Sequence, residues 1–434
     1  MNKKYKLYNN TKIIYETPDD GYSYFFGYYD KSSLNKDNTK LLTHRVAFDG
    51  RDVEDRDIAE IGYIDLDKNE FIKIDETLAW NWQQGSQLQW LPPLYDKKII
   101  YNSIQDNKFV SIIYDIETKE KKIIPFPIYV IHPNGKEALG INYERHYWCR
   151  PGYNYQNIKN KKWDKPYHEE DGIFKIDLEN GEVERIINIV DIINTERLEE
   201  FDSCNNWLEH MMYNPSGDRF MFFHRWSKDG VDLSRVYIAN SFDGKDILKL
   251  PENKFYSHYF WKNDKKLSIW TNYVNSSNDK SLNLIQKIKS IKIIKNLLKP
   301  IYNIIKSNLP KEIKNKVSPP SQLYLIDDNV DLKYNIVGEN ILNDCCLNGH
   351  QSWHKKDDKL LTDSYQDKEN FRWIYLLDTK TNNLITLAKF YSVYNDCGYR
   401  CDLHPSLSID EKYIIIDVAY GEKRKKIILE IEND

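Results

Sequence analysis

The chain has 434 residues, with 66 acidic against 62 basic side chains, a net charge of −4 and 41% hydrophobic residues. It contains no uninterrupted apolar run of 18 residues, which excludes a membrane-spanning helix. The near-neutral charge balance argues against a nucleic-acid binder, which would show a broadly basic surface.

The N-terminal region and the cysteines indicate where the protein works. Met1–Asp20 is polar and lacks the apolar stretch that a secretory signal needs. Six cysteines are too few to hold a chain of this length together by disulfides. We therefore expect a cytoplasmic protein whose cysteines are free thiols.

The predicted elements are almost all strands. Aromatic residues make up 14% of the chain, and aromatic and β-branched side chains fit a pleated, half-buried surface. Strand-like runs such as Lys98–Ser103, Val110–Ile116 and Tyr413–Val418 recur throughout the sequence. This composition predicts an all-β protein of many short strands.

A strand–turn–strand unit recurs seven times along the chain. In order, the copies lie at 31–44, 87–103, 129–142, 210–224, 258–270, 350–362 and 404–418. A four-stranded propeller blade takes roughly 40–50 residues, so seven blades account for most of the chain. The sequence predicts a seven-bladed β-propeller that spans residues 1–434 as a single domain.

Two insertions interrupt the predicted blades, at Glu144–Asp171 and at Ser276–Ser318. The second insertion holds ten lysines against Asp279 and Glu312, a net charge of +8, so the rest of the chain carries −12. Its apolar residues fall at helical spacing, and Pro300 divides the pattern into two helices. These basic amphipathic helices either contact a partner or the inner face of the membrane, or pack on the propeller with their lysines in water.

Four of the seven copies begin with a histidine that is followed three residues later by a bulky apolar residue. These are His210, His258, His350 and His404, drawn from only ten histidines in the chain. Rotational symmetry carries equivalent positions of the blades to the same depth of the central channel. We therefore expect a ring of imidazoles suited either to binding Mn, Fe or Zn or to proton transfer.

Several short motifs resemble the oligogalacturonate lyase family and its TolB-type propeller relatives. They are Trp80–Gly85, His210–Gly217, Ser257–Trp261, Gly349–His350 and Cys401–Pro405, together with Arg150–Tyr155 and Asp171–Asp177 in the relatives. The resemblance spans nearly the whole chain except the basic insertion. It implies β-elimination on a uronate-containing, acidic oligosaccharide, with a manganese ion on the channel axis that binds the uronate carboxylate.

The resemblance also implies roles for individual residues. His258 and His404 match metal ligands and His210 matches the base that removes the proton next to the carboxylate; His350, at the same repeat position, is an added ligand candidate. Asp402 stands where the family has a histidine, and Mn²⁺ accepts its oxygen. The family's glutamine falls at Tyr399, which cannot replace it.

Other side chains are candidates for contacting the substrate. Arginines bind carboxylates in a bidentate manner, which makes Arg150, Arg225 and Arg145 candidates for holding a second acidic group. Gln351 or Gln87 would supply the missing amide. Trp82, like the other tryptophans of the repeats, either stacks on a sugar ring or packs in a blade core.

Alternatives from other classes remain open at this point. Cys345, Cys346, Cys397 and Cys401 lie in neighbouring copies near two histidines, but their spacing matches no zinc motif. Serine nucleophile elbows and phosphate-binding glycine loops are absent. Because propellers host many roles, the alternative to an enzyme is a non-catalytic scaffold or saccharide-binding protein that serves surface-polysaccharide assembly at the membrane.

Overall fold

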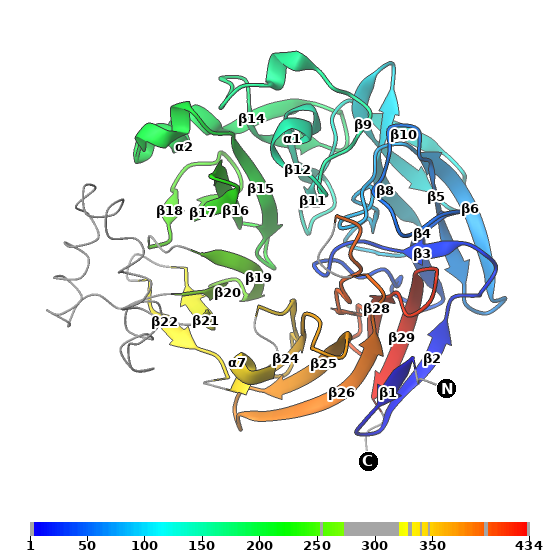
Figure 1. The fold of residues 1–434 in the computed structure, drawn as a ribbon. Coiled ribbons are helices and arrows are strands. Elements are labelled where there is room, and N and C mark those ends of the chain that lie inside the picture. Colours follow the sequence, from blue (N-terminus) through cyan, green and yellow to red (C-terminus); the bar gives the residue numbers. More distant parts are fainter. Residues whose placement is uncertain are drawn as a thin grey trace, which may run out of the picture.

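The computed structural model describes residues 4–251, 255–272, 321–328, 332–338, 341–345, 348–394 and 398–431. Within these ranges the strands form seven antiparallel sheets that radiate from a central axis (Figure 1). The chain is therefore an all-β, seven-bladed propeller, as its repeats predicted. The basic segment 276–318 lies outside the described residues.

Five blades are each built from four consecutive strands, and the other two add one strand from the start of the chain. The blades are arranged around a central axis (Figure 1). The first three blades contain β3 (Ser23–Phe25), β4 (Lys40–Val46), β5 (Ala59–Asp65) and β6 (Glu70–Thr77); β7 (Gln89–Trp90), β8 (Lys98–Gln105), β9 (Lys108–Asp115) and β10 (Lys121–Ile124); and β11 (Val130–Ile131), β12 (Glu137–Ile141), β13 (Gly172–Asp177) and β14 (Val183–Asn188). Blades four and five contain β15 (Asn206–Tyr213), β16 (Arg219–Lys228), β17 (Val231–Asn240) and β18 (Leu248–Lys249); and β19 (Tyr256–Asn263), β20 (Lys266–Thr271), β21 (Gln322–Asp327) and β22 (Tyr334–Ile336).

The last two blades join the two halves of the chain. They contain β23 (Gln351–Trp353), β24 (Lys359–Asp363), β25 (Phe371–Asp378) and β26 (Asn383–Tyr391); and β27 (Ser406–Leu407), β28 (Tyr413–Val418) and β29 (Lys425–Ile431). The early strands β1 (Tyr5–Leu7) and β2 (Thr11–Glu16) pair with β26 and β29 as their outermost strands. The ring is thus closed by hydrogen bonds between strands from opposite ends of the sequence.

The burial of each strand follows from its place in the blade. The middle strand β16 lies between neighbouring blades, so the apolar run Phe220–Phe223 is buried on both faces. The outer strand β6 has a mixed pattern of exposed and half-buried residues. Continuous apolar runs in the middle strands place the hydrophobic cores between blades, where the clusters of buried residues are found.

A few short helices decorate the blades. They are α1 (Tyr143–Cys149), α2 (Ile189–Thr195), α7 (Ile341–Cys345) and the 3₁₀ helices η1 (Lys161–Trp163) and η2 (Glu199–Asp202). The side chain of Asn142 accepts hydrogen bonds from the first backbone N–H groups of α1 and so caps it. Helices α1 and η1 lie in the predicted insertion 144–171, between β12 and β13. None of the described helices has the length and apolarity needed to cross a bilayer.

The first blade departs from the regular repeat. Phe25 pairs with His44, and Leu34 pairs with Leu41. Between these two pairs β4 moves on by three residues, whereas the opposite segment moves on by nine. Six extra residues therefore leave the sheet and enter the centre of the ring. The copy predicted at 31–44 therefore includes the bridge of Leu34 to Leu41 and most of β4, but not β3, because the extra residues separate β3 from it.

We call residues Gly27–Lys31 within this bulge the axial segment. The Asp417 carboxylate accepts a hydrogen bond from the Phe26 backbone N–H just before it, at 2.9 Å. The Tyr29 hydroxyl donates to the carbonyl of Tyr259 at 2.9 Å. The rings of Tyr28 and Tyr29 contact histidines of several blades, so the axial segment lies across the channel.

Candidate functional site

The four repeated histidines lie on or next to the innermost strands of four successive blades. His210 is in β15, His258 is in β19, and His350 and His404 precede β23 and β27. The rings of His258 and His350 are 4.0 Å apart, and those of His350 and His404 are 4.4 Å apart. These three rings form one group, which we call the histidine cluster.

His210 lies apart from the histidine cluster, on the other side of Tyr28. The ring of Tyr28 stacks on His210 at 5.5 Å and meets His404 edge-on at 5.1 Å. The expected ring of four imidazoles is therefore divided into three and one. The repeat pattern did not predict this division, because the residues that cause it belong to the bulge in the first blade.

The hydrogen bonds of the histidine cluster fix the orientation of all three rings. Nδ1 of His258 lies 2.7 Å from the carbonyl oxygen of Asn348, and Nδ1 of His404 lies 2.6 Å from that of Gly27. Nδ1 of His350 lies 2.9 Å from the carboxylate of Asp363. Since carbonyl oxygens only accept, Nδ1 of His258 and of His404 carries the proton and Nε2 keeps a lone pair. Burial raises the pKa of Asp363 to about 7, and its ionised form accepts from Nδ1 of His350 in the same way.

Two of these rings and one carboxylate form a group that could hold a metal ion. Among the described residues, Nε2 of His350 and Nε2 of His404 have no hydrogen-bond partner although both atoms are buried. One ligand atom each from His350, His404 and Asp402 lies within 4.8 Å of the others. Burial lowers the pKa of His350 and of His404 to about 3, so both rings are neutral and able to bind a cation. Imidazoles whose Nδ1 is anchored to an oxygen fit Mn, Fe or Zn.

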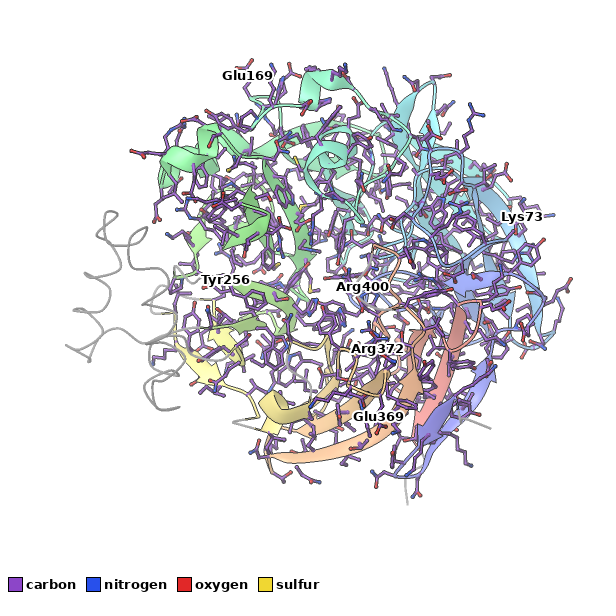
Figure 2. All side chains as sticks on the ribbon, in the orientation of Figure 1. Lys73, Glu169, Tyr256, Glu369, Arg372 and Arg400 are labelled. Carbon is purple, nitrogen blue, oxygen red and sulfur yellow. The ribbon has the colours of Figure 1, made fainter. Side chains whose placement is uncertain are left out.

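Asp402 connects the histidine cluster to two arginines. Its Oδ1 lies 2.7 Å from Nη1 of Arg372, and its Oδ2 accepts a hydrogen bond of 2.8 Å from Nε of Arg400. Burial alone would raise the pKa of Asp402, but the two guanidinium groups hold it well below its ordinary value. Both arginines lie near the centre of the ring (Figure 2). Neither was predicted, although Arg400 directly precedes the Cys401–Pro405 motif.

His210 belongs to a second polar centre. The neighbouring Glu209 is fully buried, and its carboxylate contacts Nε of Arg150 at 3.0 Å and Nε of Arg225 at 2.6 Å. Oε1 of Glu209 also lies 3.4 Å from Nε2 of His210. The predicted residues Arg150 and Arg225 thus lie beside His210, where they neutralise Glu209.

The backbone is strained at two of the histidines. His210 has a φ of 55° and His404 a φ of 45°, in the left-handed region that non-glycine residues seldom adopt. At His210 the pairing of β15 with β16 shifts between Glu209 and Met212, which marks a bulge. Such strain persists only where surrounding contacts fix it, and it is typical of functional sites.

A cavity of about 660 Å³ lies beside these two centres. Arg150, Arg400, Tyr153, Asn81 and Trp82 are among its lining residues. Nη2 of Arg400 donates a hydrogen bond of 3.1 Å to the Tyr153 hydroxyl. Arg150, from the Glu209 centre, and Arg400, from the cluster side, therefore reach the same cavity, which suits a ligand with acidic groups.

Three other predicted contact residues lie within blade cores or the interior. Arg145 is fully buried and donates to the carbonyls of Trp163, Pro166 and Asn206, so its guanidinium has no free edge for a substrate. Gln351 donates to the carbonyl of His258 and accepts from Ser268, tying two blades together. Gln87 donates to Gln84 and to the Tyr143 hydroxyl. Their polar groups serve the fold in this structure.

The tryptophans of the repeats pack in the interior. The set described as candidates for sugar stacking is at most 4% exposed and comprises Trp80, Trp82, Trp90, Trp261 and Trp353. Trp82 is one of the residues that line the cavity, and its indole N–H donates to the carbonyl of Arg51. Burial in blade cores is therefore the role that the structure shows for these rings.

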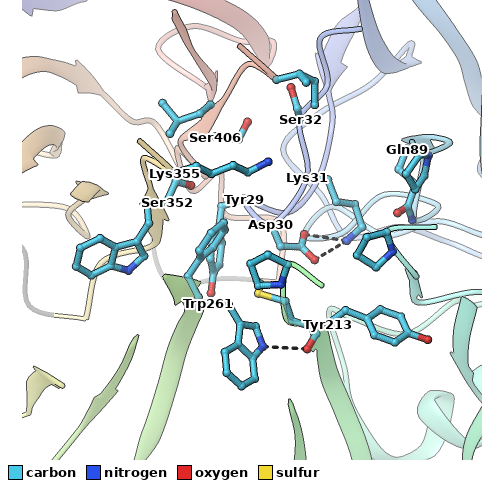
Figure 3. A pocket seen from close by; sticks show the side chains of 18 of the residues that line it. Tyr29, Asp30, Lys31, Ser32, Gln89, Tyr213, Trp261, Ser352, Lys355 and Ser406 are labelled. Atoms are coloured by element: carbon cyan, nitrogen blue, oxygen red, sulfur yellow. Dashed lines mark hydrogen bonds and ion pairs between the residues drawn. The ribbon is translucent and has the colours of Figure 1, made fainter. Parts of the chain in front are cut away.

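The opposite end of the channel holds a second cavity, of about 290 Å³ (Figure 3). Tyr29, Asp30 and Lys31 of the axial segment form part of its wall, and the Lys31 ammonium contacts both oxygens of Asp30 at 2.7 and 2.8 Å. None of the four repeated histidines lines this cavity. The candidate zinc site of four cysteines includes Cys346 and Cys397, which lie outside the described residues.

No family model and no curated protein matches the chain. Solved structures match it along its length. An oligogalacturonate lyase in complex with manganese is 17% identical with a TM-score of 0.62, over 99% of this chain and 96% of that one. The oligogalacturonate lyase of Vibrio parahaemolyticus is 16% identical with a TM-score of 0.61, over 99% and 97%. TolB of Acinetobacter baumannii is 13% identical with a TM-score of 0.37, over 88% and 66%. The chain has the propeller fold that these oligogalacturonate lyases share.

Proposed function

We propose that this protein is a metal-dependent lyase that cleaves a uronate-containing oligosaccharide by β-elimination inside the cell. The observation that carries this proposal is the histidine cluster, in which three buried imidazoles are anchored at Nδ1. The shared fold adds support, since one of the matched lyases is a manganese complex.

The residues that would hold the ion are His258, His350 and His404, with the carboxylate of Asp402 beside them. When bound, a divalent ion such as Mn²⁺ polarises a carboxylate and stabilises the negative charge that develops on it as the neighbouring proton leaves. Asp363 would orient the ring of His350 by accepting a hydrogen bond from its Nδ1–H group.

The cavity supplies the substrate contacts of this proposal. Arg400 and Arg150 line it, and each is already oriented by a buried carboxylate, Asp402 and Glu209 respectively. A guanidinium held in this way loses little entropy when it binds a carboxylate. The two arginines would therefore hold the acidic groups of a uronate chain.

The Glu209 centre supplies the proton acceptor. Burial lowers the pKa of His210 well below 6.5, so the ring is neutral and one of its nitrogens is unprotonated. Glu209 is ionised because Arg150 and Arg225 outweigh its burial and hold its pKa below the ordinary value. The carboxylate would stabilise the imidazolium that forms when His210 takes up the proton.

The experiment is a metal and product assay on the full chain. Purified protein is titrated with MnCl₂ by calorimetry and then incubated with uronate oligosaccharides while the absorbance of the unsaturated product is followed. We expect one Mn²⁺ per chain and product formation that stops when the ion is chelated. Absence of any bound transition metal, or product formation unaffected by chelation, would refute the proposal.

A saccharide-binding protein without catalytic activity is the second candidate. The observation that favours it is the position of Tyr28, which separates His210 from the histidine cluster. Binding of uronate oligosaccharides without product in the same assay would identify this function. Flotation with anionic vesicles, with and without segment 276–318, tests the membrane contact proposed for the basic insertion.

A further inference from the structure

Tyr153 lies in the insertion between β12 and β13, in the turn that follows helix α1. Its backbone N–H donates to the carbonyl of Arg150 at 3.2 Å, and its own carbonyl accepts from the side chain of Asn81 at 3.0 Å. Arg150, Asn81 and Tyr153 all line the cavity of about 660 Å³. The two backbone contacts therefore hold Tyr153 in the wall of the cavity that we assign to the substrate.

The Tyr153 hydroxyl has a hydrogen that is not used within the described part of the chain. Its oxygen accepts one hydrogen bond, from Nη2 of Arg400 at 3.1 Å, and no described residue accepts from it. A phenolic hydroxyl both accepts and donates, so this one has its hydrogen left for a molecule in the cavity. Arg400, which holds the oxygen, lines the same cavity.

The ring of Tyr153 is fixed on two further sides. The Arg150 guanidinium lies over the ring at 4.4 Å from its centroid. His210 meets the ring edge-on, with the two ring centroids 5.6 Å apart. The candidate proton acceptor and the hydroxyl-bearing ring are thus in direct contact, and the two arginines that would hold the acidic groups flank the same ring.

We infer that Tyr153 is the acid that protonates the leaving glycosidic oxygen, on the same face of the sugar from which His210 removes the proton. This inference rests on the proposed function and names the class of uronate that it leaves open. A base and an acid in contact with each other reach one face of a sugar ring, so the hydrogen on C5 and the oxygen on C4 have to share that face. They share it in glucuronate and lie on opposite faces in galacturonate.

The step balances with these two side chains. The C5 proton moves to His210, and the electron pair of the C–H bond forms the C=C bond between C4 and C5. The C4–O bond breaks with its electron pair on the oxygen, which takes the Tyr153 proton and leaves as an alcohol. The N–H group of Arg400 stabilises the negative charge on the phenolic oxygen until the proton on His210 returns to it through water.

The first test needs no variant. Wild-type protein with Mn²⁺ is given 4-linked oligosaccharides of glucuronate or of galacturonate, which differ only at C4 and yield the same unsaturated end group. We expect kcat/KM to be higher for glucuronate by about 10²-fold, the usual cost of a misplaced catalytic group. A preference for galacturonate would overturn the inference and leave the lyase proposal standing.

The second test removes the hydroxyl and then the need for it. Tyr153→Phe should lower kcat for the glucuronate oligosaccharide by about 10²–10⁴-fold with KM within about threefold, the usual contribution of a general acid. A glucuronide with fluoride on C4 has a leaving group that needs no proton, so the variant should process it at the wild-type rate. Equal losses on both substrates would mean that Tyr153 only positions Arg400, which would overturn the inference.

Tyr155→Phe is the matched control. Tyr155 lies in the same insertion, is fully buried, and its hydroxyl accepts from the side chain of Asn102 at 3.0 Å, but it lines neither of the two cavities. Both variants are checked by thermal unfolding, and the control should keep its kcat on both substrates.

The outcomes separate the two proposals. A folded Tyr153→Phe variant that keeps the wild-type kcat on the oligosaccharide would overturn the inference alone. A wild-type protein that forms no product from either uronate would refute the lyase proposal and this inference with it.

Discussion

The histidine cluster and the Glu209 centre both contain histidines from the same repeat position, but the rings have opposite hydrogen-bonding arrangements. In the cluster the Nδ1 of each imidazole faces an oxygen, and one ligand atom each from His350, His404 and Asp402 lies within 4.8 Å of the others. At His210 a carboxylate beside Nε2 and a hydroxyl beside Nδ1 reverse this arrangement. The neighbours of each ring, and not its place in the repeat, therefore decide which ring nitrogen is left free.

The first test removes one ring from each region and compares the affinities for Mn²⁺. His350→Ala should weaken Mn²⁺ binding by more than about 100-fold, because it removes a proposed ligand and even changes to residues that only orient a ligand cost about 10–100-fold. His210→Gln should leave the affinity for Mn²⁺ within about threefold of the wild-type value. Calorimetric titration measures both. Equal losses in the two variants would show that the four histidines form one site.

The second largest effect is expected on stability. Glu209→Gln removes the carboxylate that pairs with Arg225 and leaves Arg150 with Asp232 alone, so it should lower the free energy of unfolding by about 3–5 kcal/mol, the cost of breaking a buried ion pair. Denaturant titration measures the loss. Glu60→Gln is the control, since the more exposed pair of Glu60 with Arg45 should contribute less than about 1 kcal/mol.

Asp363→Asn tests the carboxylate of the other region. The variant keeps the shape of the side chain but weakens the anchor of His350 Nδ1, so we expect Mn²⁺ affinity to fall by about 10–100-fold. The corresponding change at Glu209 should leave Mn²⁺ affinity unaltered in whatever fraction is folded. An unchanged affinity in Asp363→Asn would mean that the orientation of His350 does not depend on this contact.

Arg400→Gln examines the link between the cluster and the cavity. Loss of the guanidinium should raise KM for a uronate oligosaccharide by about 10–100-fold, since charge-assisted hydrogen bonds contribute about 1.5–3 kcal/mol. Nε of Arg400 lies on Oδ2 of Asp402, the oxygen nearer to His404, so Mn²⁺ affinity should rise or stay constant. A large fall in Mn²⁺ affinity would contradict this account of Arg400.

The smallest expected effect is on the pH dependence of stability. The pKa of Glu209 is lowered in the folded protein, so below the ordinary glutamate pKa of about 4.5 the unfolded chain binds more protons than the folded one. The stabilisation is therefore complete above this pH and is lost as the pH falls, by at most about 1.4 kcal/mol per pH unit. Unfolding curves of Glu209→Gln should show a flatter acid limb than those of the wild type.

The repeats predicted the fold because each blade buries the same pattern of strands and turns. The turn after His210, His258, His350 and His404 is followed by a buried strand in every case, and these copies became the innermost strands of four blades. A rotational repeat carries sequence neighbours to equivalent places, so the approach of His258, His350 and His404 was accessible from the sequence.

The partners of these rings could not be predicted in the same way. Arg372 reaches Asp402 from β25 of the preceding blade, and Glu209 recruits Arg150 from the insertion, so both contacts join segments far apart in the sequence. Arg145 was predicted as a substrate contact because it lies in an insertion. In the structure its guanidinium is buried and donates hydrogen bonds to three backbone carbonyls. Tyr28 left no repeat signal, since it lies in residues that the other blades lack.

The axial segment has a consequence for traffic through the molecule. In some propellers the central channel is open from one face to the other. Here the axial segment crosses the channel between the histidines and the cavity on the far face, where Figure 3 shows Tyr29, Asp30 and Lys31. The described residues of the hub therefore separate the histidine side from the cavity on the far face. A molecule bound on one side cannot pass straight along the axis to the other.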